Sequence, residues 1–274
     1  MIVQIYEIQT PEEAERCLRL GVDHIGSVLL SVGEWRQPAI RDVIGLTRGT
    51  SAKSSLIPLF PDEDLLYRSM DYYRPDFVHF CESLTDEQGH IRDLDPVKER
   101  QIRFKARFPG IGIIRTLPVP GPGQVAGFPS LEIAAALEGT SDFFLTDTWM
   151  GREPVEGYLG ITGRPGDLEI ARNLVRQSRI PVILAGGLSP ANVYESVCYI
   201  QPAGADSCTL TNAADPTGQP IRFKKDFDKV AAFIAEVRRA EKDMAAPLPA
   251  RGNTSPLITL NEDKQNEKLK QRTG

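Results

Sequence analysis

Short runs of apolar and β-branched residues alternate along the chain with longer stretches in which apolar positions recur at helical spacing. The short runs predict strands at residues 2–8, 23–29, 55–60, 76–81, 111–116, 142–147, 181–185 and 205–209. The longer stretches predict helices at residues 11–21, 38–46, 63–70, 96–107, 131–137, 167–177, 190–199 and 224–242. This alternation is typical of β-α units packed on a parallel sheet.

The number of units indicates the architecture. Eight strands, each followed by a helix, fit within about 242 residues, which is the usual length of a (β/α)8 barrel. A doubly wound sheet more often stops at five or six strands. The expected fold class is therefore α/β, with a single TIM barrel over residues 1–242. Residues 243–274 contain three prolines and no aromatic residue, and they are expected to form a disordered tail.

Two predicted helices carry readable start signals. Thr10 stands where an N-cap is expected, with Pro11 at the first helical position, Glu13 three residues after the cap and Gly21 at the end. The seventh predicted strand stops at Gly186-Gly187, and Ser189 is the expected N-cap of the helix that follows.

Composition and charge narrow the classes of function. Lys and Arg number 32 against 37 Asp and Glu, giving a net charge of −5, so no overall basic field attracts nucleic acid or an anionic membrane. The sequence has no apolar run of membrane-spanning length and no signal-peptide pattern at its start, which predicts a soluble cytoplasmic protein. The four cysteines and three histidines lack metal-ligand spacing, so no metal is expected.

In a (β/α)8 barrel the active site is built at the carboxyl ends of the strands. The Gly186-Gly187 turn follows the seventh strand, where barrels frequently bind phosphate on exposed backbone N–H groups; the alternative is that these glycines only permit a tight turn. Side chains alternate along a strand, so Tyr6, Cys81 and Cys208 are expected at the barrel mouth if Gln4, His79 and Asp206 point inward.

Several motifs together resemble one known family. The segments are TPEEA at residues 10–14, GVDHIG at 21–26, LTDT at 145–148, GITGRPGD at 160–167 and PVILAGGLSPANV at 181–193. To about Arg239 the chain resembles phosphoribosylanthranilate isomerase, the cofactor-free (β/α)8 enzyme of tryptophan biosynthesis. That enzyme converts a phosphoribosylamine to an aminodeoxyribulose phosphate.

The resemblance implies roles for residues at matching positions. Asp147 would be the general acid, with a local cap or loop anchor as the alternative. Arg36 would pair with the substrate carboxylate, unless it is a surface arginine. Asp206 would hydrogen-bond a sugar hydroxyl or cap local backbone. The family's phosphate-side loops correspond here to Gly160, Gly163, Gly186 and Gly187.

The chain departs from the family pattern at the ends of the first, fourth and eighth strands, and the fourth reads His79-Phe80-Cys81-Glu82. Tyr6 stands where the family has its general-base cysteine, and it is either a tuned base or a packing residue. Leu210 replaces a phosphate-side glycine after the eighth strand, which argues against close backbone approach there. Cys81 or Cys208 could supply a replacement base, although buried cysteines are commonly small apolar packing residues.

The leading hypothesis is an isomerase that uses acid/base chemistry, and no cofactor, on a small phosphorylated metabolite. Two alternatives stay open: a barrel relative with a changed reaction on another phosphorylated metabolite, and a non-catalytic descendant that binds a ligand or a protein partner. Neither nucleic acid nor membrane is an expected partner, and the chain could form a homodimer.

Overall fold

The computed structural model describes residues 1–125 and 127–246. Within them eight parallel strands pair in chain order, and β8 pairs with β1 to close a barrel. This confirms the predicted TIM barrel. The barrel strands are β1 (Ile2–Ile5), β2 (His24–Leu29), β3 (Lys53–Pro58), β4 (Phe77–Phe80), β5 (Gly112–Pro120), β6 (Phe143–Trp149), β7 (Val182–Leu184) and β8 (Gly204–Ser207).

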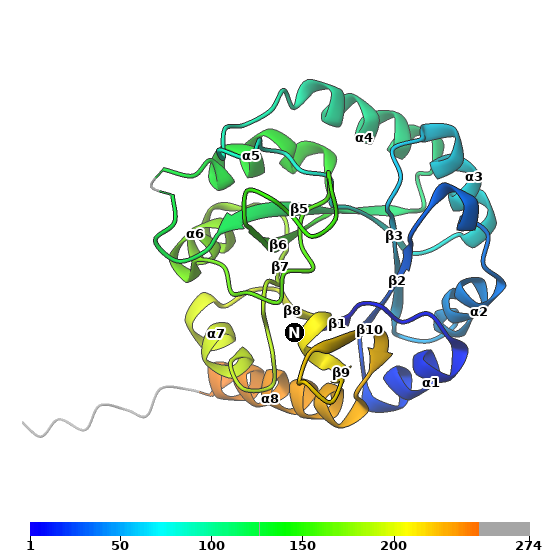
Figure 1. The fold of residues 1–274 in the computed structure, drawn as a ribbon, viewed down its shortest axis with the longest axis vertical. Coiled ribbons are helices and arrows are strands. Elements are labelled where there is room, and N and C mark those ends of the chain that lie inside the picture. Colours follow the sequence, from blue (N-terminus) through cyan, green and yellow to red (C-terminus); the bar gives the residue numbers. More distant parts are fainter. Residues whose placement is uncertain (126, 247–274) are drawn as a thin grey trace, which may run out of the picture. The chain divides into compact units, whose positions relative to one another are not determined.

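Helices surround the strands as an outer ring (Figure 1). Each predicted helix is present, with bounds that differ by a few residues. The α-helices are α1 (Pro11–Leu20), α2 (Pro38–Thr47), α3 (Glu63–Tyr73), α4 (Asp95–Arg107), α5 (Ser130–Leu137), α6 (Leu168–Gln177), α7 (Val193–Ile200) and α8 (Phe227–Ala245). Short 3₁₀ turns occur at Val32–Glu34 (η1), Glu138–Thr140 (η2) and Thr209–Thr211 (η3).

The core has an inner and an outer part. Apolar side chains at alternate strand positions, including Ile114, Leu145 and Ile183, form a buried cluster inside the barrel. Further buried clusters join the outer faces of the strands to the helices. Since both faces of every strand are covered, the strands read as nearly continuous apolar runs, which is why they were visible in the sequence.

The first helix begins as the sequence predicts. The Thr10 side chain accepts a hydrogen bond from the Glu13 backbone N–H, and Pro11 occupies the first turn. Gly21 ends the helix in the left-handed conformation, with φ of 82°. Both ends of α1 are thus fixed by short local signals.

The start of α7 differs from the prediction. The helix begins at Val193, with Asn192 in the N-cap position, so Ser189 is not the cap. Ser189 instead lies in a turn that Asn192 stabilises: Asn192 Oδ1 accepts from the Ser189 N–H at 2.8 Å, and its Nδ2 donates to the Gly187 carbonyl at 2.9 Å. The polar residues after the glycines therefore stabilise the turn rather than extend the helix.

Strands β5 and β6 extend beyond their predicted ends, to Pro120 and Trp149. Parallel pairing continues through the prolines at the end of β5, with Pro118 opposite Asp147 and Pro120 opposite Trp149. The extension places Asp147 inside a paired strand and so fixes its backbone firmly.

A hairpin that was not predicted follows β8. Strands β9 (Asn212–Ala214) and β10 (Pro220–Lys225) pair antiparallel, and the last two residues of β10 stand where the last helix was expected to begin. The helix α8 starts later, at Phe227, where Asp226 Oδ1 accepts from the Asp228 and Lys229 N–H groups. Only residues 224–225 were misassigned to the helix, because β10 is short and leads almost directly into α8.

The last helix also ends later than predicted. Helix α8 continues to Ala245, three residues beyond its predicted end at Lys242. The rest of the predicted tail, from residue 247, lies outside the described residues. None of the helices that the structure describes has the length and apolar character needed to cross a lipid bilayer.

Candidate active site

A cavity of about 540 Å³ opens at the carboxyl ends of the barrel strands. Its lining includes the carboxyl groups of Asp147 and Asp206 together with several apolar side chains. Its lining residues are Tyr6, Glu7, Val28, Ile57, Leu59, His79, Cys81, Thr116, Leu145, Asp147, Tyr158, Leu159, Ile161, Asp206, Cys208 and Arg222.

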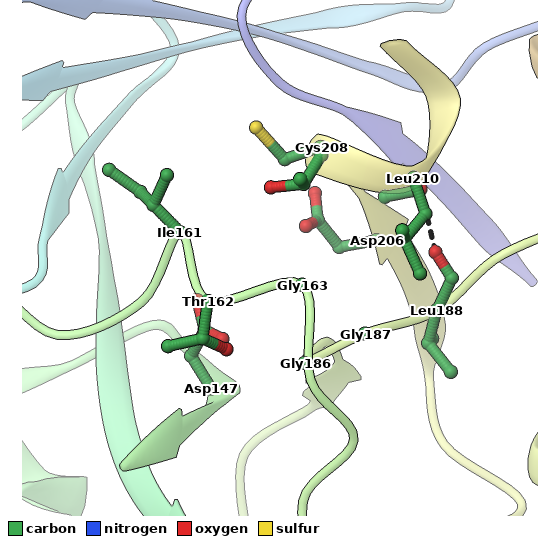
Figure 2. Close-up of a pocket in the computed structure, with 12 residues that line it drawn as sticks. Asp147, Ile161, Thr162, Gly163, Gly186, Gly187, Leu188, Asp206, Cys208 and Leu210 are labelled. Atoms are coloured by element: carbon green, nitrogen blue, oxygen red, sulfur yellow. Dashed lines mark hydrogen bonds between the residues drawn. The ribbon is translucent and has the colours of Figure 1, made fainter. Parts of the chain in front are cut away.

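A smaller recess of about 310 Å³ adjoins this cavity and shares four of its lining residues, among them Asp147 and Asp206. Its walls are largely backbone: the loop after β6 contributes Gly163, the turn after β7 contributes Gly186 and Gly187, and η3 follows β8. Figure 2 shows these glycines on the loops that lie beside Asp147 and Asp206. The recess is open although Leu210 is one of its lining residues.

Asp147 is half-buried on β6 and lines both the cavity and the recess. Burial raises the pKa of its carboxyl from 3.8 to about 7, and the nearby Glu153 charge adds to the rise. One contact opposes this rise in pKa by stabilising the charged form: Asp147 Oδ1 accepts a hydrogen bond from the Thr148 backbone N–H at 2.8 Å. Near neutral pH this carboxyl can therefore hold and release a proton.

Asp206 lies on β8, on the other side of the recess (Figure 2). Its side chain is 7% exposed, and burial raises its pKa from 3.8 to about 7, with a further contribution from the Asp147 charge. Asp206 Oδ1 accepts a hydrogen bond from Gln4 Nε2 at 3.1 Å, and Gln4 Oε1 lies 3.1 Å from His24 Nδ1. Residues on β1 and β2 thus hold the carboxyl in position.

The glycines around the recess are required by close backbone approach. A Cβ on Gly187 would lie 2.4 Å from the carbonyl carbon of Arg164, and one on Gly186 would lie 2.5 Å from Thr148 Oγ1. A Cβ on Gly160 would lie 2.3 Å from Asp147 Oδ2. All three residues have positive φ, so both the limited space and the backbone conformation require glycine at these positions.

This geometry makes a prediction about stability. Gly187→Ala should lower the free energy of unfolding by about 1–3 kcal/mol, because it combines a left-handed backbone with a backbone clash. Gly45→Ala, inside α2 with no neighbour within 4 Å of the added Cβ, should stabilise by up to about 1 kcal/mol. Urea unfolding of both variants measures the difference. Equal stability of Gly187→Ala and the wild type would contradict the packing described here.

Tyr6 points into the barrel, where its ring packs directly on the backbone of β2. A Cβ on Gly26 would lie 2.2 Å from the ring. The hydroxyl group hydrogen-bonds Ser55 Oγ and lies 2.7 Å from His79 Nδ1, while His79 Nε2 lies 2.6 Å from Thr116 Oγ1. Burial raises the pKa of Tyr6 well above 10 and lowers the pKa of His79 to about 3. At neutral pH both side chains are therefore uncharged, and the phenol keeps its proton.

The two cysteines expected at the mouth also line the cavity. Burial raises the pKa of the Cys81 thiol and of the Cys208 thiol well above the ordinary value for cysteine. A thiol that keeps its proton at neutral pH is a poor base. Their surroundings favour the packing alternative over the replacement base.

The hairpin β9–β10 brings Arg222, a residue that the sequence did not indicate, to the mouth, where it meets Glu7 just after β1. Glu7 has φ of 63° and a buried carboxylate that accepts from Asn212 Nδ2 at 2.8 Å and Arg222 Nε at 2.8 Å. Burial opposes ionisation of Glu7, but these hydrogen bonds and the Arg222 charge lower its pKa overall. Glu7 is therefore a charged anchor for the hairpin.

Arg36 is not brought to the site. It is exposed, it lines neither the cavity nor the recess, and its guanidinium stacks on Tyr72 of α3 with 4.8 Å from Cζ to the ring centroid. The adjacent backbone is held there because the Tyr73 hydroxyl donates to the Trp35 carbonyl and accepts from the Gln37 N–H. The structure therefore supports the surface alternative for Arg36.

Comparisons with known proteins show the family. No protein-family model matches the chain. An N-(5'-phosphoribosyl)anthranilate isomerase from Haloferax volcanii is 35% identical over 161 residues, which cover 58% of this chain and 67% of that protein. The chain belongs to the phosphoribosylanthranilate isomerase family.

Similarity to this family extends over most of the chain. N-(5'-phosphoribosyl)anthranilate isomerase 1 from Methanosarcina mazei is 25% identical over 244 residues, covering 87% of this chain and 95% of that protein. The solved phosphoribosyl anthranilate isomerase from Thermotoga maritima has a TM-score of 0.62 and 18% identity, covering 87% of this chain and all of that one. The latter supports the barrel fold.

The structure gathers most of the residues to which the phosphoribosylanthranilate isomerase resemblance assigned roles. Asp147 and Asp206 line both the cavity and the recess, and Gly163, Gly186 and Gly187 line the recess. Gly160 packs against Asp147. Among the described residues no cluster of three or more His, Cys, Asp or Glu side chains could hold a metal ion.

Proposed function

We propose that this protein isomerises phosphoribosylanthranilate, or a near relative that carries the same groups, by acid/base catalysis without a cofactor. The observation that carries the proposal is the pair of carboxyl groups, Asp147 and Asp206, at one cavity beside a recess walled by glycine backbone. Burial raises the pKa of each to about 7. Family membership supplies the substrate class.

The first step of an Amadori rearrangement needs an acid. Protonation of the ribose ring oxygen breaks its bond to C1′ and leaves a Schiff base between C1′ and the amine nitrogen. Asp147 suits this step because a carboxyl with a pKa near 7 is partly protonated at neutral pH and can give that proton to an ether oxygen.

The second step needs a base that removes the C2′ proton of the Schiff base, giving an enolamine that tautomerises to the ketose. Asp206 is the group we assign to this step. Its carboxylate form is accessible near neutral pH, whereas Tyr6, Cys81 and Cys208 have raised pKa values and keep their protons. Tyr6 then acts as a packing residue that fills the floor of the cavity.

The recess is the proposed position of the substrate phosphate. The backbone after β7 turns through Gly186 and Gly187, both with positive φ, and the loop after β6 passes close by at Gly163. Backbone N–H groups exposed by such turns bind phosphate in many barrels. The sugar would then lie between Asp147 and Asp206.

Turnover of freshly generated phosphoribosylanthranilate tests the proposal. Loss of its fluorescence should proceed faster with the protein than without it, and the product should be the corresponding aminodeoxyribulose phosphate. A folded sample that gives only the uncatalysed rate would overturn the proposal. The changed-reaction and non-catalytic alternatives would then take its place.

Three expectations from the sequence stay predictions. These are the organisation into a barrel of residues 1–242 and a tail of residues 243–274, a cytoplasmic location, and assembly as a homodimer. A small phosphorylated metabolite is the partner that the proposed activity requires.

A further inference from the structure

We propose that Arg222 binds the carboxylate of the substrate's aromatic acid, and that the aromatic ring packs on the apolar residues that line the cavity. The inference rests on the proposed function, because it assigns the subsite for the one substrate group that the phosphate recess and the two carboxyl groups leave unplaced. The family resemblance assigned this group to Arg36, which lies elsewhere.

Arg222 reaches the cavity from β10, in the hairpin that follows β8. Its Nε donates to Glu7 Oε1 at 2.8 Å, and its guanidinium lies against the Phe223 ring, 4.6 Å from Cζ to the centroid. These two contacts fix the plane of the guanidinium. Among the described residues neither Nη1 nor Nη2 of Arg222 has a hydrogen-bond acceptor, so both can bind an incoming carboxylate.

Glu7 accepts a hydrogen bond from one nitrogen of Arg222 only, Nε. Its carboxylate also accepts from Asn212 Nδ2 at 2.8 Å and from the Phe223 N–H at 3.2 Å, so one side of it is satisfied by the hairpin itself. The carboxylate is 1% exposed, while the Arg222 side chain is 37% exposed. Both side chains line the cavity, and within the described part of the chain Nη1 and Nη2 of the more exposed Arg222 stay free for a ligand.

No other cation competes for the role. Arg222 is the one Arg or Lys side chain among the described residues that line the cavity or the recess. His79 is uncharged at neutral pH, since burial lowers its pKa to about 3. Lys225, the last residue of β10, does not line the cavity; its Nζ donates to the Cys208 carbonyl at 2.8 Å and to Asn212 Oδ1 at 2.6 Å.

The same cavity offers a surface for an aromatic ring. Its apolar lining comes from strands β2, β3 and β6, from the residue after β3 and from the loop after β6, so several elements offer apolar surface to a ring. Aromatic rings gain binding free energy mainly by burying such apolar area. The residues of this lining are Val28, Ile57, Leu59, Leu145, Tyr158 and Leu159.

Two ligands that differ by one group test the assignment. One is the reduced product analogue 1-(2-carboxyphenylamino)-1-deoxyribitol 5-phosphate, and the other is the same compound without the carboxylate. Their dissociation constants are measured by calorimetry for the wild type, Arg222→Met, Arg222→Lys and Arg36→Met. Arg36→Met is the matched control because it removes the same charge outside the cavity.

Arg222→Met should weaken binding of the carboxylate ligand by roughly 10- to 100-fold and leave the ligand without a carboxylate within about twofold. Arg222→Lys should lose part of the affinity, because an ammonium lacks the guanidinium fork. Arg36→Met should bind both ligands as the wild type does. Circular dichroism melting confirms that each variant is folded.

The outcomes separate the two proposals. If the wild type prefers the carboxylate ligand and Arg36→Met removes the preference while Arg222→Met does not, the assignment to Arg222 is wrong and the proposed function stands. If Arg222→Met weakens both ligands equally, Arg222 positions the hairpin rather than binding the carboxylate. If the wild type binds neither ligand, the proposed function itself fails.

Discussion

Replacing Asp147 by asparagine is expected to lower kcat for phosphoribosylanthranilate by roughly 100- to 10,000-fold with little change in KM. The amide has nearly the same shape, and its oxygen can still accept the hydrogen bond that Asp147 takes from the Thr148 N–H. It cannot protonate the ring oxygen. The measurement is the steady-state rate of fluorescence loss at saturating substrate.

Asp42→Asn is the matched control, since Asp42 is exposed on the outer face of α2 and should leave the rate unchanged. The pH dependence gives a second check. Burial raises the pKa of Asp147 to about 7, so the acid form is present below that pH and is lost above it. The wild-type rate should therefore fall on the alkaline side. A kcat for Asp147→Asn within tenfold of the wild type would assign the acid to another group.

The fold was predictable because the information that specifies it is local and repeated. Strands that are buried on both faces read as apolar runs, as in β2 and β6, and the N-cap and C-cap of α1 are written in Thr10 and Gly21. Strand alternation also placed Tyr6, Cys81 and Cys208 at the mouth from the sequence alone.

The hairpin was missed although the sequence contains a signal for it. Residues 215–218 read Asp-Pro-Thr-Gly, a turn in which Asp215 Oδ1 accepts from the Thr217 and Gln219 N–H groups. The flanking segments are short and partly exposed, so neither reads as a buried strand. Arg222 was missed as a consequence, since it meets Glu7 only through this hairpin, across 215 positions of sequence.

The position of Arg36 shows a second reason why the sequence alone did not identify the site residues. A motif match fixes a residue's place in the sequence, but its place in space depends on contacts with other elements. Here the hydroxyl of Tyr73, at the end of α3, holds the backbone on both sides of Arg36, and the guanidinium stacks on Tyr72. The sequence around Arg36 carries no sign of these partners.

Replacing Asp206 by asparagine is the second variant with a large expected effect, a loss of roughly 100- to 10,000-fold in kcat if this carboxylate removes the C2′ proton. A residue that only binds a sugar hydroxyl would raise KM and leave most of kcat. Substrate deuterated at C2′ distinguishes these roles. Slowing the proton abstraction should produce a larger primary isotope effect in Asp206→Asn than in Asp147→Asn, whose slow step is ring opening. An unchanged isotope effect would remove Asp206 from the chemical step.

The same variant should be more stable than the wild type at alkaline pH. The folded-state pKa of Asp206 is about 7 against 3.8 for the free side chain, so the folded protein holds the proton more tightly than the unfolded chain does. Its contribution to stability therefore falls as the pH rises from about 4 to about 7 and stays low above that range. Asparagine carries no charge and can still accept from Gln4 Nε2, so Asp206→Asn should gain on the order of 2 kcal/mol at pH 8 and little at pH 4. A gain confined to alkaline pH, accompanied by loss of turnover, is the result expected of a carboxylate kept in a destabilising position for catalysis.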